Sequence, residues 1–141
     1  MKVMCKLIHG DSRLPLRQSM NSAGFDLHSI EEALIKPGEI WMISTGVCIE
    51  IPWGYEGQVR PRSSVGKKGV IIPNSPGTID SDYRGEVKVL LMNLSTVDFK
   101  VNVGDRIAQI VFLKLPVAKV EPALELSETK RGPGGFGSTG V

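Results

Sequence analysis

The chain has 141 residues and a mass of 15.3 kDa, which corresponds to one domain with enough apolar side chains for a single core. Its 17 basic and 15 acidic residues leave a net charge of +2, which argues against broad binding to a nucleic-acid backbone but not against binding a small anion. Cys5 and Cys48 lack metal-ligand spacing, so we expect reduced packing residues. No apolar run is long enough to cross a bilayer or to form a signal peptide, and we therefore expect a soluble protein in the cytoplasm or elsewhere inside a cell.

Short apolar segments separated by Gly and Pro turns predict β-strands along most of the chain. The predicted strands are Met1–Leu7, Ile40–Ile43, Val47–Ile51, Tyr55–Arg60, Glu86–Met92, Phe99–Val101, Arg106–Lys114 and Val117–Glu121. One short helix is expected at Ser63–Lys68. Because no segment has a sustained helical period, the pattern indicates an all-β sandwich or barrel. We expect this domain to cover residues 1–126 and a flexible, glycine-rich arm to cover residues 127–141.

The first segment that could carry chemistry is Ala23-Gly-Phe-Asp-Leu-His28, which contains one carboxylate, Asp26. This carboxylate could orient water bound to a magnesium ion or could simply cap a turn, and the residues alone leave both interpretations open. His9 and His28 belong to no His/Cys set with zinc spacing.

A basic segment follows at Arg60-Pro-Arg-Ser-Ser-Val-Gly-Lys-Lys-Gly69. Arg62, the hydroxyls of Ser63 and Ser64, and backbone donors at the expected helix start suit phosphate binding. The spacing differs from that of a Walker P-loop, which argues against an NTPase of that type. A basic surface turn without function explains the same residues equally well.

The segment Asn74-Ser-Pro-Gly-Thr-Ile-Asp-Ser-Asp-Tyr-Arg-Gly85 contains two carboxylates and a tyrosine between expected strands. A hairpin turn accounts for its Asp and Gly residues without any chemistry. An Asp in this turn could also accept a proton from a water molecule that attacks a phosphate. Further along the chain, Gln109 lies within an apolar strand and requires a hydrogen-bond partner there.

The C-terminal segment Arg131-Gly-Pro-Gly-Gly-Phe-Gly-Ser-Thr-Gly140 has the composition of a disordered terminus. Glycine, however, lets backbone N–H groups converge on an anion, while Arg131 can pair with phosphate and Phe136 offers a stacking face. The composition therefore also fits a flap that orders over a nucleotide. The residues alone lead to a phosphate-binding β protein with an aromatic flap.

In chain order, these four segments and the stretch that ends at Gln109 resemble the five motifs of the trimeric dUTPase family across residues 23–140. The matching stretches are Ala23-Gly-Phe-Asp-Leu27, Pro61-Arg-Ser-Ser64, Gly77-Thr-Ile-Asp-Ser-Asp-Tyr-Arg-Gly85, Gly104-Asp-Arg-Ile-Ala-Gln109 and Arg131-Gly-Pro-Gly-Gly-Phe-Gly-Ser-Thr-Gly140. The resemblance implies a distorted jelly-roll β-barrel that forms a homotrimer with shared active sites. It also implies Mg²⁺-dependent hydrolysis of dUTP to dUMP and pyrophosphate, which limits uracil incorporation into DNA and supplies dUMP for thymidylate synthesis.

The same resemblance assigns residue roles. Asp80 would be the general base, Tyr83 would pack under the deoxyribose, and Asn74 with the Gly77 backbone would bind the uracil edge. Asp26 would contact Mg²⁺ through water. The phosphate oxygens would be bound by Arg62, Ser63, Ser64 and Gln109. The arm residues that would close over the nucleotide are Arg131, Phe136, Gly137, Ser138 and Thr139. Motif two departs from the common family pattern, because Ser64-Val65-Gly66 stands where Gly-Leu-Ala is frequent.

Two other functions remain as alternatives. A dCTP deaminase of similar fold also uses an Arg-Ser-Ser segment, but it needs a glutamate where this chain has Leu90, which cannot transfer a proton. A non-catalytic nucleotide-sensing module would have no reason to keep the carboxylate of Asp80. The sequence therefore favours the hydrolase.

Overall fold

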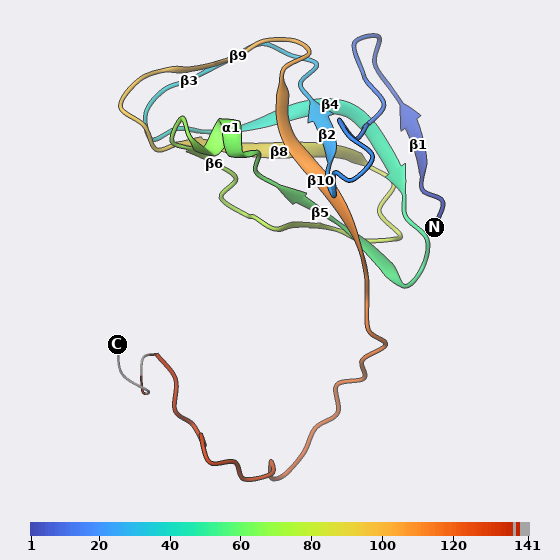
Figure 1. Ribbon diagram of the computed structural model, residues 1–141, viewed down its shortest axis with the longest axis vertical. Helices are drawn as coiled ribbons and strands as arrows, with labels where there is room; N and C mark the ends of the chain where they lie inside the picture. Colours follow the sequence, from blue (N-terminus) through green and yellow to red (C-terminus); the bar gives the residue numbers. More distant parts are fainter. Residues whose placement is uncertain (137, 139–141) are drawn as a thin grey trace.

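The computed structural model describes residues 1–136 and residue 138 and has an all-β body from which the C-terminal segment extends away (Figure 1). The strands in this part of the chain are β1 (Met4–Leu7), β2 (Phe25–His28), β3 (Ala33–Ile35), β4 (Ile40–Glu50), β5 (Tyr55–Arg60), β6 (Val70–Ile71), β7 (Gly77–Ile79), β8 (Glu86–Asn93), β9 (Phe99–Val101) and β10 (Arg106–Lys114). A single helical turn, α1 (Ser63–Gly66), interrupts them.

Two four-stranded sheets form the body, with strand orders β1-β4-β8-β6 and β2-β10-β5-β7, and a small β3-β9 sheet lies beside them. All strand pairs are antiparallel, as expected for a jelly-roll type of fold. The buried core draws on both large sheets: Val89 and Leu91 come from β8, and Val59 and Ile110 come from β5 and β10. The predicted all-β class is therefore confirmed.

Buried and outward-facing side chains alternate along β8, and only the outward-facing ones can line a surface pocket. Val87, Val89 and Leu91 are buried, whereas the residues between them point to the other face of the sheet. That outer face carries the pocket described below.

Most of the predicted strands are present. Those at Tyr55–Arg60, Phe99–Val101 and Arg106–Lys114 have the predicted bounds. The two strands predicted between Ile40 and Ile51 are one strand, β4, with a register shift between Ser44 and Cys48 in its pairing with β8. The sequence missed β2, β3, β6 and β7, which are two to four residues long.

The predicted strand at Val117–Glu121 is wrong for the single chain. The backbone N–H of Leu115 still donates to Gly54 O at 2.8 Å, but the following residues form no strand and leave the body (Figure 1). Pro116 has no backbone N–H to donate to a ladder, and a strand without a partner gains no ladder hydrogen bonds. Val117, Val120, Leu124 and Leu126 are consequently exposed.

Cys5 and Cys48 are free thiols on the neighbouring strands β1 and β4, as expected. Burial raises the pKa of the Cys5 thiol, and the nearby Cys48 adds to this effect. Within the described residues, no helix has the length and hydropathy needed to cross a membrane.

Candidate active site

One pocket brings together three of the residues that the sequence singles out, Asn74, Asp80 and Tyr83. It has a volume of about 370 Å³ and lies between the turn after β7 and the outer face of β4 and β8. The remaining lining residues are Met42, Thr78, Ile79, Glu86, Lys88 and Leu90. An aromatic face, an amide and a carboxylate around one opening suit a polar, ring-containing ligand.

Tyr83 is fixed to β8 by its hydroxyl, which donates to Glu86 O at 3.0 Å. Its backbone N–H donates to Asp80 O at 3.2 Å, so the turn that carries Asp80 also places the phenol. A Cβ added to Gly85 would collide with the ring carbons and hydroxyl of Tyr83. The glycine is therefore required for the ring to fold back over the chain.

Replacing Gly85 by Ala is expected to displace the Tyr83 ring and to raise KM for the pocket's ligand about tenfold. Gly10→Ala is the matched control, because an added Cβ there meets no atom within 4 Å. Steady-state kinetics measures KM for both variants, and thermal unfolding shows whether both remain folded. Equal KM values for the two variants would contradict the predicted displacement of the Tyr83 ring.

A second cluster forms around Asp26, which is 6% exposed. Arg62 Nε lies 2.9 Å from Asp26 Oδ1, and an Arg106 terminal nitrogen lies 3.3 Å from Oδ2. Arg62 also reaches Ser64 Oγ at 3.2 Å and Arg106 O at 3.3 Å. Two cations and a hydroxyl around one carboxylate leave positive charge for an anion.

Gln109 joins this cluster from β10, where it pairs with Asp26 of β2 and with Arg60 of β5. Its Nε2 donates to Pro61 O at 2.9 Å, which supplies the partner that the sequence required. A Cβ on Gly24 would collide with the Gln109 side chain, so the glycine of the first motif makes room for the glutamine of the fourth. Ser63, directly after Arg62, begins α1.

Arg106 and His28 belong to the same region, although the sequence did not single them out. The Nδ1 atom of His28 is buried without a hydrogen-bond partner among the described residues. Burial lowers the pKa of His28, and the charges of Arg13 and Arg106 lower it further, whereas Asp26 opposes the shift. The lowered pKa favours the neutral form of His28, and the positive charge of the cluster comes from its arginines.

The described residues contain no group of three or more His, Cys, Asp or Glu side chains that could hold a metal ion. Both oxygens of Asp26 face arginines, but a carboxylate has about four acceptor positions and can still accept a hydrogen bond from metal-bound water. These residues fit a magnesium ion that is bound mainly by phosphate oxygens and water.

The two clusters stay apart in the single chain. Arg62 and Ser64 line another cavity, of about 250 Å³, which shares no residue with the pocket of Asp80. Within the described residues, no hydrogen bond or ion pair joins Asp26, Arg62 or Gln109 to the side chains of Asn74, Asp80 or Tyr83. The two clusters thus line separate cavities of the single chain.

The arm residues lie away from both clusters (Figure 1). Arg131 Nε donates to Gly134 O at 2.8 Å, and Phe136 is exposed with a φ of 50°. Ser138 is also exposed. Gly137 and Thr139 lie outside the described residues.

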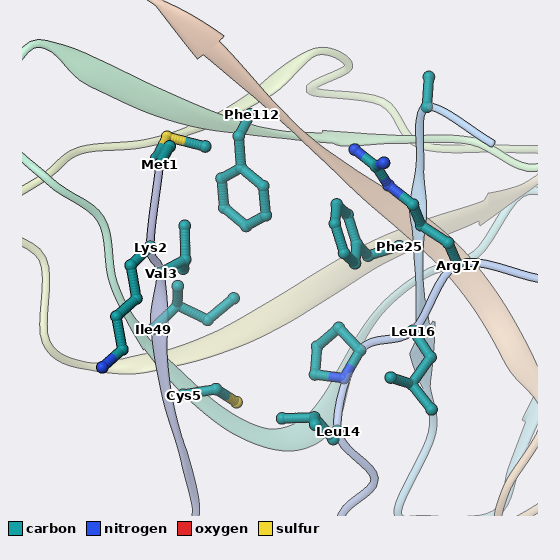
Figure 2. Close-up of a pocket in the computed structure, with 12 residues that line it drawn as sticks. Met1, Lys2, Val3, Cys5, Leu14, Leu16, Arg17, Phe25, Ile49 and Phe112 are labelled. Carbon is teal, nitrogen blue, oxygen red and sulfur yellow. The ribbon is translucent and has the colours of Figure 1, made fainter. Parts of the chain in front are cut away.

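A larger cavity of about 700 Å³ contains none of the predicted site residues. Figure 2 shows Val3, Ile49, Phe25 and Phe112 facing a common space beside the N-terminal strand. The Arg17 guanidinium lies 4.6 Å from the centre of the Phe25 ring at the edge of this space. The cavity is thus a mainly apolar groove with basic side chains at its rim.

Comparison with known proteins identifies the family of this chain. A family model described as dUTPase matches residues 11–140. The deoxyuridine 5'-triphosphate nucleotidohydrolases of Helicobacter pylori (strain Shi470) and Nautilia profundicola are each 51% identical to the chain; the alignments cover 100% and 99% of it and 98% and 99% of the relatives.

Solved structures agree with the sequence relatives. A mutant dUTPase of Staphylococcus bacteriophage 80alpha with dUpNHpp superimposes with a TM-score of 0.92 at 27% identity, covering 99% of both chains. A mutant dUTPase from phage phi11 of S. aureus, described with a structural Mg(II) ion, has a TM-score of 0.84 at 24% identity and covers 91% of this chain and 100% of its own; it supports the fold alone. The chain therefore belongs to the dUTPase family and hydrolyses dUTP to dUMP and pyrophosphate.

Proposed function

We propose that Asp80 is the general base of this hydrolysis and activates the water that attacks the α-phosphorus. Tyr83 packs under the deoxyribose and leaves no room for a 2′-hydroxyl, and Asn74 binds the uracil edge with the backbone at Gly77. The observation that carries this proposal is the single pocket that holds Asn74, Asp80 and Tyr83. A carboxylate beside the nucleoside is where a base for attack on the α-phosphorus is needed.

The cluster around Asp26 takes the phosphates. Arg62, Ser63, Ser64 and Gln109 bind phosphate oxygens, and Asp26 accepts a hydrogen bond from water on Mg²⁺. When bound, the ion neutralises phosphate charge and orients the triphosphate. The chain's own contribution is to hold the phosphates in line, and the pairing of Asp26 with Arg62 and Arg106 keeps these side chains in place.

The separation of the two clusters supports a homotrimer in which each site combines residues of different subunits. The β body, residues 1–126, supplies the two clusters, and the arm, residues 127–141, closes over a site with Arg131, Phe136, Gly137, Ser138 and Thr139. Closure of this kind excludes water and completes the set of phosphate contacts.

The segment before the arm supports the same assembly. Its exposed side chains, Val117, Val120, Leu124 and Leu126, match the apolar groove beside the N-terminal strand (Figure 2). Lys2 and Arg17 line this groove, whereas Glu121 and Glu125 lie in the exposed segment. We place this segment of one copy in the groove of another.

The enzyme acts inside the cell, where removal of dUTP limits uracil incorporation into DNA and dUMP supplies thymidylate synthesis. Its substrate is the nucleotide dUTP, and we expect it to bind neither membranes nor nucleic acids directly. Leu90 lines the pocket at the position where a deaminase would need a proton-transferring group, which supports hydrolysis over deamination.

The test is pyrophosphate release from dUTP, dCTP, dTTP and UTP, each with Mg²⁺ and with excess EDTA. We expect release from dUTP alone and its loss in EDTA. Ammonia release from dCTP, or tight binding of dUTP without turnover, would overturn the proposal.

A further inference from the structure

The pocket of Asp80 has an unfavourable charge for a nucleotide. Two carboxylates, Asp80 and Glu86, line it, and Lys88 is the one basic side chain among its described lining residues. A triphosphate carries several negative charges, and each carboxylate within a few ångströms opposes its approach. Within a single chain, Lys88 is therefore the one source of positive charge among the described lining residues of this pocket.

Lys88 is held in this pocket by its neighbours. Glu86 Oε1 accepts hydrogen bonds from the backbone N–H groups of Thr45, at 3.1 Å, and Gly46, at 2.8 Å. These two bonds fix the carboxylate so that its other oxygen lies 3.6 Å from Lys88 Nζ. The Glu86 side chain is 17% exposed and that of Lys88 39% exposed, so the ammonium keeps access to the solvent side of the pocket.

The strand geometry explains why this pair faces the site. Glu86 and Lys88 alternate with the buried residues Val87 and Val89 and therefore share the outer face of β8. Tyr83 donates its hydroxyl hydrogen bond to the backbone of the same Glu86. The ring proposed to lie under the sugar and the lysine are thus attached to one short stretch of strand.

We propose that Lys88 is a further substrate-binding residue, which attracts the α-phosphate of the nucleotide while Glu86 keeps its ammonium in the pocket. The inference rests on the proposed placement of the nucleoside beside Asp80 and Tyr83. In this arrangement Asp80 and Lys88 act on opposite partners of one step, since the carboxylate takes the proton of water and the ammonium draws the phosphate. Lys88 lies outside the five motifs.

The experiment compares ligands that differ in the phosphate alone. Binding of 2′-deoxyuridine, dUMP and a non-hydrolysable imido analogue of dUTP is measured by calorimetry with Mg²⁺. The proteins are the wild type, Lys88→Met, Lys88→Gln and Lys88→Arg, with Lys36→Met as the control for an exposed lysine away from the pocket. Light scattering confirms that each variant keeps the mass of the wild-type assembly.

The loss of a charge-assisted contact is expected to weaken dUMP and the imido analogue about 10- to 100-fold in Lys88→Met and Lys88→Gln. 2′-Deoxyuridine, which has no phosphate, keeps its affinity, and Lys88→Arg recovers most of the loss. Unchanged dUMP binding, or an equal loss for dUMP and 2′-deoxyuridine, would overturn the role of Lys88. Failure of the proposed nucleoside site is a different result, since the wild type itself would then fail to bind 2′-deoxyuridine.

Discussion

Asp80→Asn is expected to lower kcat about 10²- to 10⁴-fold while leaving the affinity for nucleotide close to that of the wild type. The amide cannot accept the proton of the attacking water, but it has nearly the shape of the carboxylate. We expect the other lining residues, including Asn74 and Tyr83, to keep their positions. Single-turnover kinetics with dUTP, together with binding of the imido analogue, separates the two quantities.

Asp82→Asn is the matched control for this variant. Asp82 lies in the same turn, two residues further along, but it does not line the pocket. We expect its kcat to equal that of the wild type. If Asp82→Asn lost turnover and Asp80→Asn kept it, the general base would be Asp82 and the assignment to Asp80 would be wrong.

Removal of residues 131–141 is expected to leave a folded, assembled protein with activity reduced about 10²-fold or more. The body needs none of these residues, because the core lies between the two large sheets. The loss falls on catalysis, since Arg131 and Phe136 would no longer close over the nucleotide. Circular dichroism, light scattering and kcat/KM for dUTP measure the three properties.

Co-expression of the arm-deleted chain with the Asp80→Asn chain tests whether sites are shared. In a mixed assembly, some sites take Asp80 from a deleted chain and the arm from a substituted chain. Such sites restore part of the wild-type activity, although each variant alone is nearly inactive. If the mixture showed no more activity than its two components, each chain would have to close its own site.

The strands that the sequence predicted best are those with a clear strand composition and clear turn residues at both ends. β10 is largely apolar, β5 alternates polar and non-polar residues, and both lie between Gly and Pro turns and have the predicted bounds. β2 was missed because Asp26 within Phe25–His28 suggested a turn, whereas a buried strand can carry an aspartate that has two arginine partners. Val117–Glu121 has strand composition, but no described segment of the same chain pairs with it.

The sequence names candidate site residues, but it does not give their arrangement in space. The ion pair of Asp26 with Arg106 joins residues 80 positions apart, and local patterns carry no signal for it. The same holds for the separation of the Asp80 pocket from the Asp26 cluster. The position of Lys88 in the pocket was predictable, because its alternation with Val87 and Val89 places it on the outer face of a strand that closely follows Tyr83.

A structure of the assembled enzyme with Mg²⁺ and the imido analogue of dUTP tests the central claim most directly. It should place a carboxylate oxygen of Asp80 within hydrogen-bond reach, about 2.6–3.2 Å, of a water in line with the α-phosphorus. A carboxylate directed away from the nucleotide, with another group holding that water, would contradict the proposed chemistry.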